Sequence, residues 1–350
     1  MSDHSDHIPV LTPAIFNGDL PSLRELRLFS VRTKPPWKNM VNLVSFTLVY
    51  MRPGEVLVGH LLDFFESAPC LREVDLIFAT PTSSTQDGRL VSLGCLKRMD
   101  IIGNGPPSLL LDHLLIPVGA TLKTQANFVG PLIEDHLPRS LENLRNLSGF
   151  TEIHLYACER HAHVQFSGAN GQVTMIPVAG RFKSVRLVLE ALTQINTSGA
   201  ERLEIEYDGP SFAYLPHQTL LPMKRLRTLT LSHCRNLYIF IDALRPRVRA
   251  EDVIFPELED VIYPELGDVI CPELEELVLV PCLGGEELDI SRVARMAAAR
   301  ASRGAKLRSI RIVSHDGALK TKALKLKKHV LRVKCGPDVG EASDDSGEEN

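Results

Sequence analysis

Apolar residues recur along this chain in a fixed frame, in which positions 1, 4 and 6 carry leucine or a similar side chain. The clearest case is the stretch 226–237, LRTLTLSHCRNL, with Leu229 and Leu231 at its centre and Cys234 at position 9. Because Leu229 and Leu231 alternate with polar residues, the pattern predicts a short strand with one apolar face. One such unit cannot bury that face alone, so the frame requires neighbours stacked on both sides.

The frame recurs over most of the chain. Further units begin at Leu23, Leu43, Leu71, Leu96, Phe150, Phe182, Ala200, Leu274 and Leu307, and a weaker unit lies around Leu122. Position 9 carries Asn or Cys in four units, where the chain is expected to bend off the strand and bury a small residue that can satisfy its polar group. We therefore predict buried bends at Asn104, Cys158, Cys234 and Cys282.

This frame is the leucine-rich-repeat signature. It predicts an α/β fold, a leucine-rich-repeat solenoid over residues 1–335 with a curved parallel sheet inside and helices and irregular loops outside. Helical spacing of apolar residues predicts helices over Glu55–Ser67 and Ser108–Leu115, and a cap at Asp289 or Ser291 with a stop at Gly304 predicts a third. Alternating runs between 158 and 180 predict additional strands.

A tandem octet interrupts the regular spacing. DVIFPELE, DVIYPELG and DVICPELE follow one another over residues 252–275, and Leu229 and Leu277 are 48 residues apart where most intervals are 18 to 33. Removing two octets, 16 residues, returns this interval to 32. We therefore predict that only the third copy leads into a repeat strand. Because each copy has a proline in its middle, the other two are expected to form a loop.

Charge and composition exclude several classes of function. The net charge of −4 over 350 residues provides no electrostatic basis for a nucleic-acid partner, and no apolar run reaches the roughly 18 residues of a membrane span. The first residues have no secretory-signal pattern, and the 7 cysteines include no C-x-x-C pair. These features predict reduced thiols and a cytoplasmic or nuclear protein.

Residues 336–350 form an acidic tail, which is expected to be disordered because it has too few apolar residues to bury. Ser343 and Ser346 precede acidic residues and are candidate sites for an acid-directed kinase, although ordinary solvated disorder is the favoured interpretation of this segment.

The chain resembles the leucine-rich-repeat portion of F-box-like proteins of mushroom-forming fungi. LPSLRELRL near the start, LLPMKRLRTLTLSHC, PELEELVL and ARASRGAKLRSIRI carry this resemblance, which covers residues 10 to about 335. The family implies the target-recognition half of a ubiquitin-ligase substrate receptor. The helical F-box that precedes the repeats in that family has no counterpart before Leu20, so direct binding to the ligase adaptor is not expected.

No catalytic, cofactor or metal site is predicted. His154, Cys158, His161 and His163 have metal-ligand side chains, and a zinc-dependent activity is the alternative. We favour a structural interpretation because Cys158 is expected to face the core and His154 the opposite way. No G-x-S-x-G sequence is present, so the chain is predicted not to be an enzyme. On the predicted third helix, Arg292, Arg295, Arg300 and Arg303 are expected to form a solvated face.

Function is instead expected on the residues between the leucines, which face away from the core onto the concave sheet. Their mixture of both charges with apolar and aromatic side chains favours an unknown protein as partner. The alternative is a free-standing repeat scaffold or a truncated, non-functional relative. The predicted partner-binding residues are Arg27, Asp75, Asp100, His154, Tyr156, Arg186, Glu204, Thr230 and Arg311.

Overall fold

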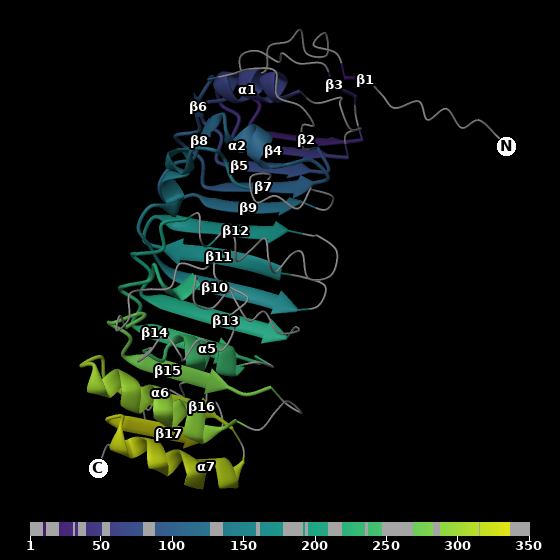
Figure 1. Cartoon of the computed structure of the whole chain (residues 1–350). Helices are drawn as coiled ribbons and strands as arrows, with labels where there is room; N and C mark the ends of the chain where they lie inside the picture. Colours follow the sequence, from purple (N-terminus) through teal and green to yellow (C-terminus); the bar gives the residue numbers. More distant parts are fainter. Residues whose placement is uncertain are drawn as a thin grey trace, which may run out of the picture. The chain divides into compact units, whose positions relative to one another are not determined.

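A computed structural model of the chain is shown in Figure 1. It describes residues 10–11, 21–30, 32–33, 40–50, 57–79, 88–126, 136–158, 162–177, 192, 195–208, 219–234, 237–246, 269–282, 288–314 and 316–336. The chain divides into two compact units, Met1–Ala200 and Glu201–Asn350, and each is described by itself below. Both contain parallel strands and helices, so the fold class is α/β, as predicted.

The first unit contains a mixed sheet in which the strands from β2 to β9 are parallel. Its strands, in spatial order, are β2 (Glu25–Phe29), β4 (Ser45–Val49), β5 (Glu73–Ile77), β7 (Arg98–Gly103), β9 (Thr121–Ala126), β12 (Gly171–Pro177), β11 (Ala162–Gly168) and β10 (Phe150–Cys158). Two small parallel pairs accompany it, β1 (Val10–Leu11) with β3 (Arg32–Thr33) and β6 (Val91–Ser92) with β8 (Leu114–Leu115). Its helices are α1 (Val58–Ser67), α2 (Ser108–Leu111), η3 (Leu141–Asn143) and η4 (Arg145–Leu147).

The second unit contains parallel strands only among its described residues. In spatial order these are β13 (Arg202–Asp208), β14 (Thr228–Ser232), β15 (Glu276–Val280), β16 (Ser309–Val313) and β17 (Arg332–Gly336). The helical elements are α5 (Leu237–Ala243), α6 (Ile290–Ser302), α7 (Gly317–Ala323) and η6 (Leu324–Lys328).

The predicted frame sets the pairing register of the parallel strands. In the first unit, position 4 of one repeat pairs with position 4 of the next, giving the row Leu26, Phe46, Val74, Met99 and Leu122. In the second unit the equivalent row is Leu203, Leu229, Leu277 and Ile310. These side chains are buried apart from Leu26, which is half-buried on the terminal strand β2. A one-residue slip would turn every such row towards solvent, so burial of the leucines fixes the register.

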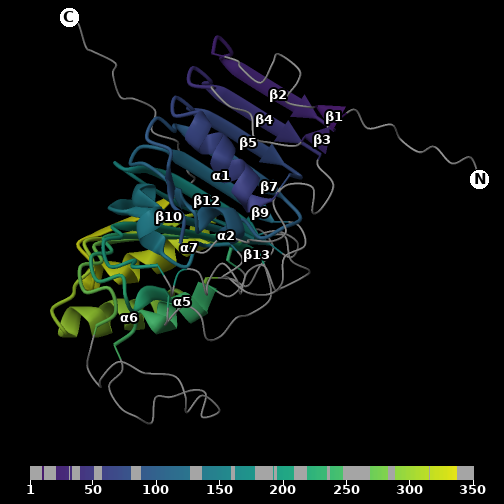
Figure 2. The ribbon, with the colours of Figure 1, turned by 90° about the horizontal axis from the view of Figure 1, so that it is seen from above.

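Helix α1 covers part of the buried sheet face in the first unit (Figure 2). Its apolar side chains follow helical spacing, and the Phe64 ring lies 4.3 Å from the Phe46 ring of β4, centroid to centroid. Phe65 and Leu62 of the same helix are almost fully buried. The leucine-bearing face of the strands is therefore the packed face, and the alternate residues lie on the open face.

Four strands end on the same strained turn, which the sequence analysis did not predict. Ser30, Tyr50, Phe78 and His233 each follow a strand and have φ between 49° and 57°, a region that side-chain-bearing residues enter at a cost. Each donates its backbone N–H to a carbonyl oxygen at the end of the next strand, at 2.5–2.9 Å: Val49, Ile77 and Val280 are the last residues of their strands, and Ile102 is the last but one of β7. This hydrogen bond recurs in register with the frame and offsets the strain.

Several sequence predictions need correction. The sheet is not wholly parallel, because β10, β11 and β12 form consecutive antiparallel pairs. These extra strands were predicted, but their direction was not. The helix predicted over Ser108–Leu115 ends at Leu111, and the chain then forms β8. The unit at Phe182, the two octets over 252–267 and the tail from 337 lie outside the described residues, so those predictions remain predictions.

The bend prediction holds for one position of four. Cys234 is 4 % exposed and its thiol donates to the backbone oxygens of Ser232 and Ile205, at 3.4 and 3.7 Å. Asn104 is exposed instead. Strand β7 extends to Gly103, which is buried, so the residue that follows it lies on the solvent side. Cys158 is the last residue of the nine-residue strand β10 and is half-buried, so it is not a buried bend residue. Cys282 is only half-buried as well.

Arg300 contradicts the predicted solvated face of the third helix. Asp289 caps α6 and Gly304 follows its end with a φ of 80°, both as predicted. Arg300, however, is 0 % exposed and donates to the carbonyl oxygens of Ile270 and Cys271, both at 2.7 Å. Burial lowers the pKa of its guanidinium to about 10. The buried arginine therefore fixes the third octet in place just before β15.

Candidate functional site

The open face of the first sheet carries one continuous row of polar side chains. Strand pairing aligns the second outward position of every strand, so residues far apart in sequence become neighbours. The row runs Arg27, Thr47, Asp75, Asp100, Lys123, Thr174, Gln165 and His154. The structure thus brings four of the predicted partner-binding residues, Arg27, Asp75, Asp100 and His154, into a single row.

Charge pairs bridge neighbouring strands within this face. Arg98 binds Asp75 at 2.6 Å and lies 3.4 Å from Asp100, and Thr47 donates to Asp75 at 3.3 Å. The two carboxylates raise the pKa of Arg98, Asp100 more than Asp75, so the guanidinium stays charged. Arg27 pairs with Glu25 on its own strand. This face therefore presents oriented carboxylates and exposed arginines side by side.

An aromatic group lies at the β10 end of this face. Tyr156 stacks on His163 of the paired strand, with ring centroids 5.1 Å apart and an interplanar angle of 22°. His154 meets the same His163 ring edge-on at 5.7 Å. All three side chains are half-buried. Stacked rings held by two strands provide rigid contact area at little entropic cost. His161 and Arg186, named from the sequence, lie outside the described residues.

The remaining predicted residues share a row in the second unit. Glu204, Thr230 and Arg311 occupy the second outward position of β13, β14 and β16, with Val278 of β15 between Thr230 and Arg311. Glu204 is exposed, whereas Thr230 and Arg311 are half-buried. The frame thus places all three on one surface of this unit, as it does for the row of the first unit.

The open strand face of the second unit has a hollow where its strands begin. A hollow of about 630 Å³ lies over the first outward residues of β13 to β17 and the residues just before them. Its lining residues are Glu201, Arg202, Arg227, Thr228, Glu275, Glu276, Arg308, Ser309, Leu331 and Arg332. Arg308 pairs with Glu275 at 3.2 Å, while Leu331 is 72 % exposed. Charged groups of both signs beside an exposed leucine favour recognition of a polypeptide.

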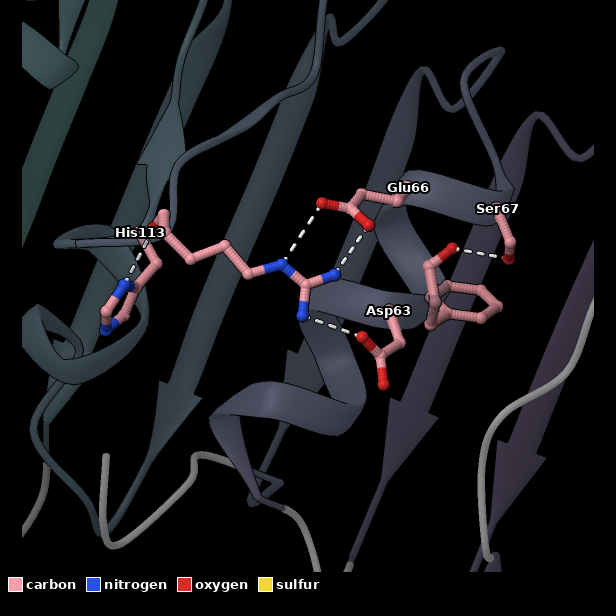
Figure 3. Close-up of polar contacts among 6 residues, drawn as sticks. Asp63, Glu66, Ser67 and His113 are labelled. Atoms are coloured by element: carbon pink, nitrogen blue, oxygen red, sulfur yellow. Dashed lines mark hydrogen bonds and ion pairs between the residues drawn. The ribbon is translucent and has the colours of Figure 1, made fainter. Parts of the chain in front are cut away.

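The sequence analysis did not predict a group of charged side chains in which Arg89 binds two carboxylates of α1 (Figure 3). Arg89 holds Glu66 through two nitrogens, at 2.5 and 3.1 Å, and Asp63 through a third at 2.7 Å. These hydrogen bonds, that to Glu66 more than that to Asp63, raise the pKa of Arg89. His113 Nδ1 lies 2.9 Å from the Arg89 carbonyl oxygen. The D-x-x-E spacing on a predicted helix was the available signal, since it places both carboxylates on one face.

The Arg89 group is a structural clamp. All three charges are satisfied within it, and it ties α1 to the segment before β6, on the helical side of the molecule. A site for an anionic ligand needs a guanidinium with free donors, whereas here the donors of Arg89 are taken by the two carboxylates.

Two of the seven cysteines, Cys234 and Cys271, are buried. Burial raises the pKa of Cys234 and of Cys271 to about 12, so both thiols stay protonated and non-nucleophilic. Over the described part of the chain, no three His, Cys, Asp or Glu side chains lie close enough together to hold a metal ion.

The comparisons with known proteins add no assignment. No family model, curated protein or solved structure matches the chain. None of the helices in the described ranges has the length and apolar character to span a bilayer.

Proposed function

We propose that the chain is a leucine-rich-repeat solenoid whose open strand faces bind another protein, as the target-recognition part of an F-box-like ubiquitin-ligase substrate receptor. The observation that supports this proposal is the alignment of the residues between the leucines into continuous rows, with Asp75, Asp100, His154 and Arg27 in one of them. The ligase connection comes from the sequence resemblance. Binding without catalysis is part of the same proposal.

The physical argument for a protein partner is preorganisation. Side chains on paired strands lose little further freedom when a partner docks, so contact energy is not consumed by ordering the surface. The open strand face of the first unit combines oriented carboxylates, cations and the stacked Tyr156–His163 pair, a composition typical of protein interfaces. A uniformly basic surface, which a nucleic acid requires, is not what these rows present.

A selection experiment tests this proposal. A displayed library of folded domains and peptides is selected on the intact chain, and each ligand is then measured against two double variants. Asp100→Ala with Tyr156→Ala changes the open face, whereas Arg139→Ala with Arg145→Ala changes exposed residues outside the sheet. We expect the first pair to weaken binding at least tenfold, since interface hot spots contribute roughly 2 kcal/mol or more, and the second pair to leave it unchanged.

The outcome that contradicts the proposal is equally specific. If the selected ligands bind the open-face variant as tightly as the native chain and lose affinity for the Arg139 and Arg145 variant, the binding surface lies outside the strands. Melting curves of both variants check that the fold is intact. A separate measurement, binding of the chain to the ligase adaptor, addresses the ligase role. We expect the chain by itself not to bind the adaptor.

A further inference from the structure

The last described elements of the second unit carry many positive charges and no negative ones. Residues 317–336 contain seven lysines and arginines and no aspartate or glutamate, in a chain whose net charge is −4. We call these seven side chains the basic cap. They belong to α7, η6 and β17, which contact one another; α7 and β17 lie together in Figure 1. Such a density of one sign needs a counter-charge to offset self-repulsion.

For five of the seven cap residues, the described part of the chain supplies no paired carboxylate. Lys325, Lys327 and Lys328 on η6 are exposed, while Leu326 between them is buried. Arg332 and Lys334 on β17 are exposed as well. Within the described ranges none of these five forms an ion pair with a carboxylate. Leu324 and Leu331, at 52 % and 72 % exposure, add apolar surface among the cations.

A segment of matching charge follows β17 directly. Residues 338–350 carry six aspartates and glutamates and no lysine or arginine. They begin two residues beyond Gly336, the last residue of the strand. The fourteen residues from 337 span at most roughly 45 Å when extended, whereas β17 is about 13 Å long, so the segment can reach every cation of the cap.

We propose that the acidic segment 338–350 docks in cis on the basic cap and occupies it as an intramolecular counter-ion. Attachment to Gly336 gives the segment a local concentration in the millimolar range, so a weak ionic contact suffices for occupancy. Among the described strands, β17 is also the terminal strand of its sheet, and no other described strand pairs with its outer edge beside Arg332 and Lys334. Docking would thus shield both the charge and the edge. This inference does not depend on the proposed function.

A peptide with the sequence 337–350, carrying a fluorophore, tests the proposal on three forms of the protein. A chain ending at Gly336 should bind the peptide at low salt, and the full chain should bind it at least tenfold more weakly because its own segment competes. Lys325→Gln with Lys327→Gln and Lys328→Gln in the shortened chain should abolish binding. The matched control, Lys97→Gln with Lys224→Gln, neutralises exposed lysines elsewhere and should bind normally.

Two results would overturn the proposal. One is equal peptide binding by the full and the shortened chain. The other concerns a nucleic acid: a single-stranded fourteen-nucleotide oligothymidylate that binds both chains equally, and more tightly than the peptide binds, would identify the cap as a nucleic-acid surface open in the native protein. Loss of peptide binding at roughly 0.5 M salt is expected, since the Debye length falls to a few ångströms.

Discussion

The three octets make a matched pair of deletions possible, because removing either the second or the third shortens the chain by the same eight residues. Deleting 260–267 leaves the third octet before β15, with Cys271 as in the native chain. Deleting 268–275 brings the second octet into that place, with Tyr263 where Cys271 was and Gly267 where Glu275 was. The two products therefore have equal length and differ at two positions.

The structure sets the expected difference. Cys271 is 1 % exposed, its thiol lies 3.4 Å from the Leu220 carbonyl oxygen, and its own carbonyl accepts from Arg300. A tyrosine ring has no room at this place, and overpacking a filled core costs about 1–3 kcal/mol. Loss of Glu275, which pairs with Arg308 on the surface, adds at most about 1 kcal/mol. The buried substitution therefore dominates.

Thermal unfolding followed by circular dichroism measures this difference. The 260–267 deletion should melt at the native temperature, whereas the 268–275 deletion should melt roughly 2–16 °C lower, at about 2–4 °C per kcal/mol for a unit of this size. Cys271→Tyr in the full chain should reproduce most of that decrease. Equal melting temperatures for the two deletions, or a native melting temperature for Cys271→Tyr, would refute the assignment of the third octet to the core.

Three further predictions concern stability. Leu229→Asp places a charge at a position that is 0 % exposed and should abolish cooperative urea unfolding of the second unit, whereas Leu229→Met should cost less than about 1.5 kcal/mol. Arg89→Met should lower the midpoint of urea unfolding modestly. Added salt should reduce this difference in midpoint from the native chain, because the ion pairs with Asp63 and Glu66 are partly exposed and are screened by salt. Burial lowers the pKa of His136 from 6.5 to about 4. Between pH 4 and pH 6.5 the folded state therefore binds fewer protons at this side chain than the unfolded state does. Its contribution to stability is complete above pH 6.5 and should fall by about 1.4 kcal/mol per pH unit towards pH 4, and His136→Phe should remove this dependence.

The apolar frame predicted most of the parallel repeat strands and which of their residues face the core, but not the antiparallel pairing of β10, β11 and β12 or the small pairs β1/β3 and β6/β8. Leu229 and Leu231 face the core because period-two alternation and burial leave no other arrangement of a short strand. The same alternation placed Asp75 and Asp100 on the open side. Asp289 and Gly304, read as the start and stop of a helix, bound α6 as expected, because capping is decided by local backbone geometry.

Features that depend on contacts between distant residues were beyond such a prediction. Arg300 resembles any helical arginine in sequence, and its burial depends on carbonyl oxygens 29 and 30 residues away. Arg89 reaches two carboxylates across 23 and 26 residues. Tyr50 and Phe78 adopt φ values usually left to glycine, because the hydrogen bond to the next strand outweighs the local preference. The pattern of apolar and polar residues contains no information on these contacts or backbone angles.

Site-specific photo-crosslinking tests the central claim most directly. A benzophenone side chain is placed at Asp100 or Thr230 on the open strand faces, and in parallel at Arg139 or Glu273, which are exposed outside the strands. Each protein is irradiated with the ligand obtained by selection. If the open faces bind the partner, crosslinks form from Asp100, Thr230 or both, and not from Arg139 or Glu273. Crosslinks from Arg139 or Glu273 alone would contradict the assignment of binding to the strand faces.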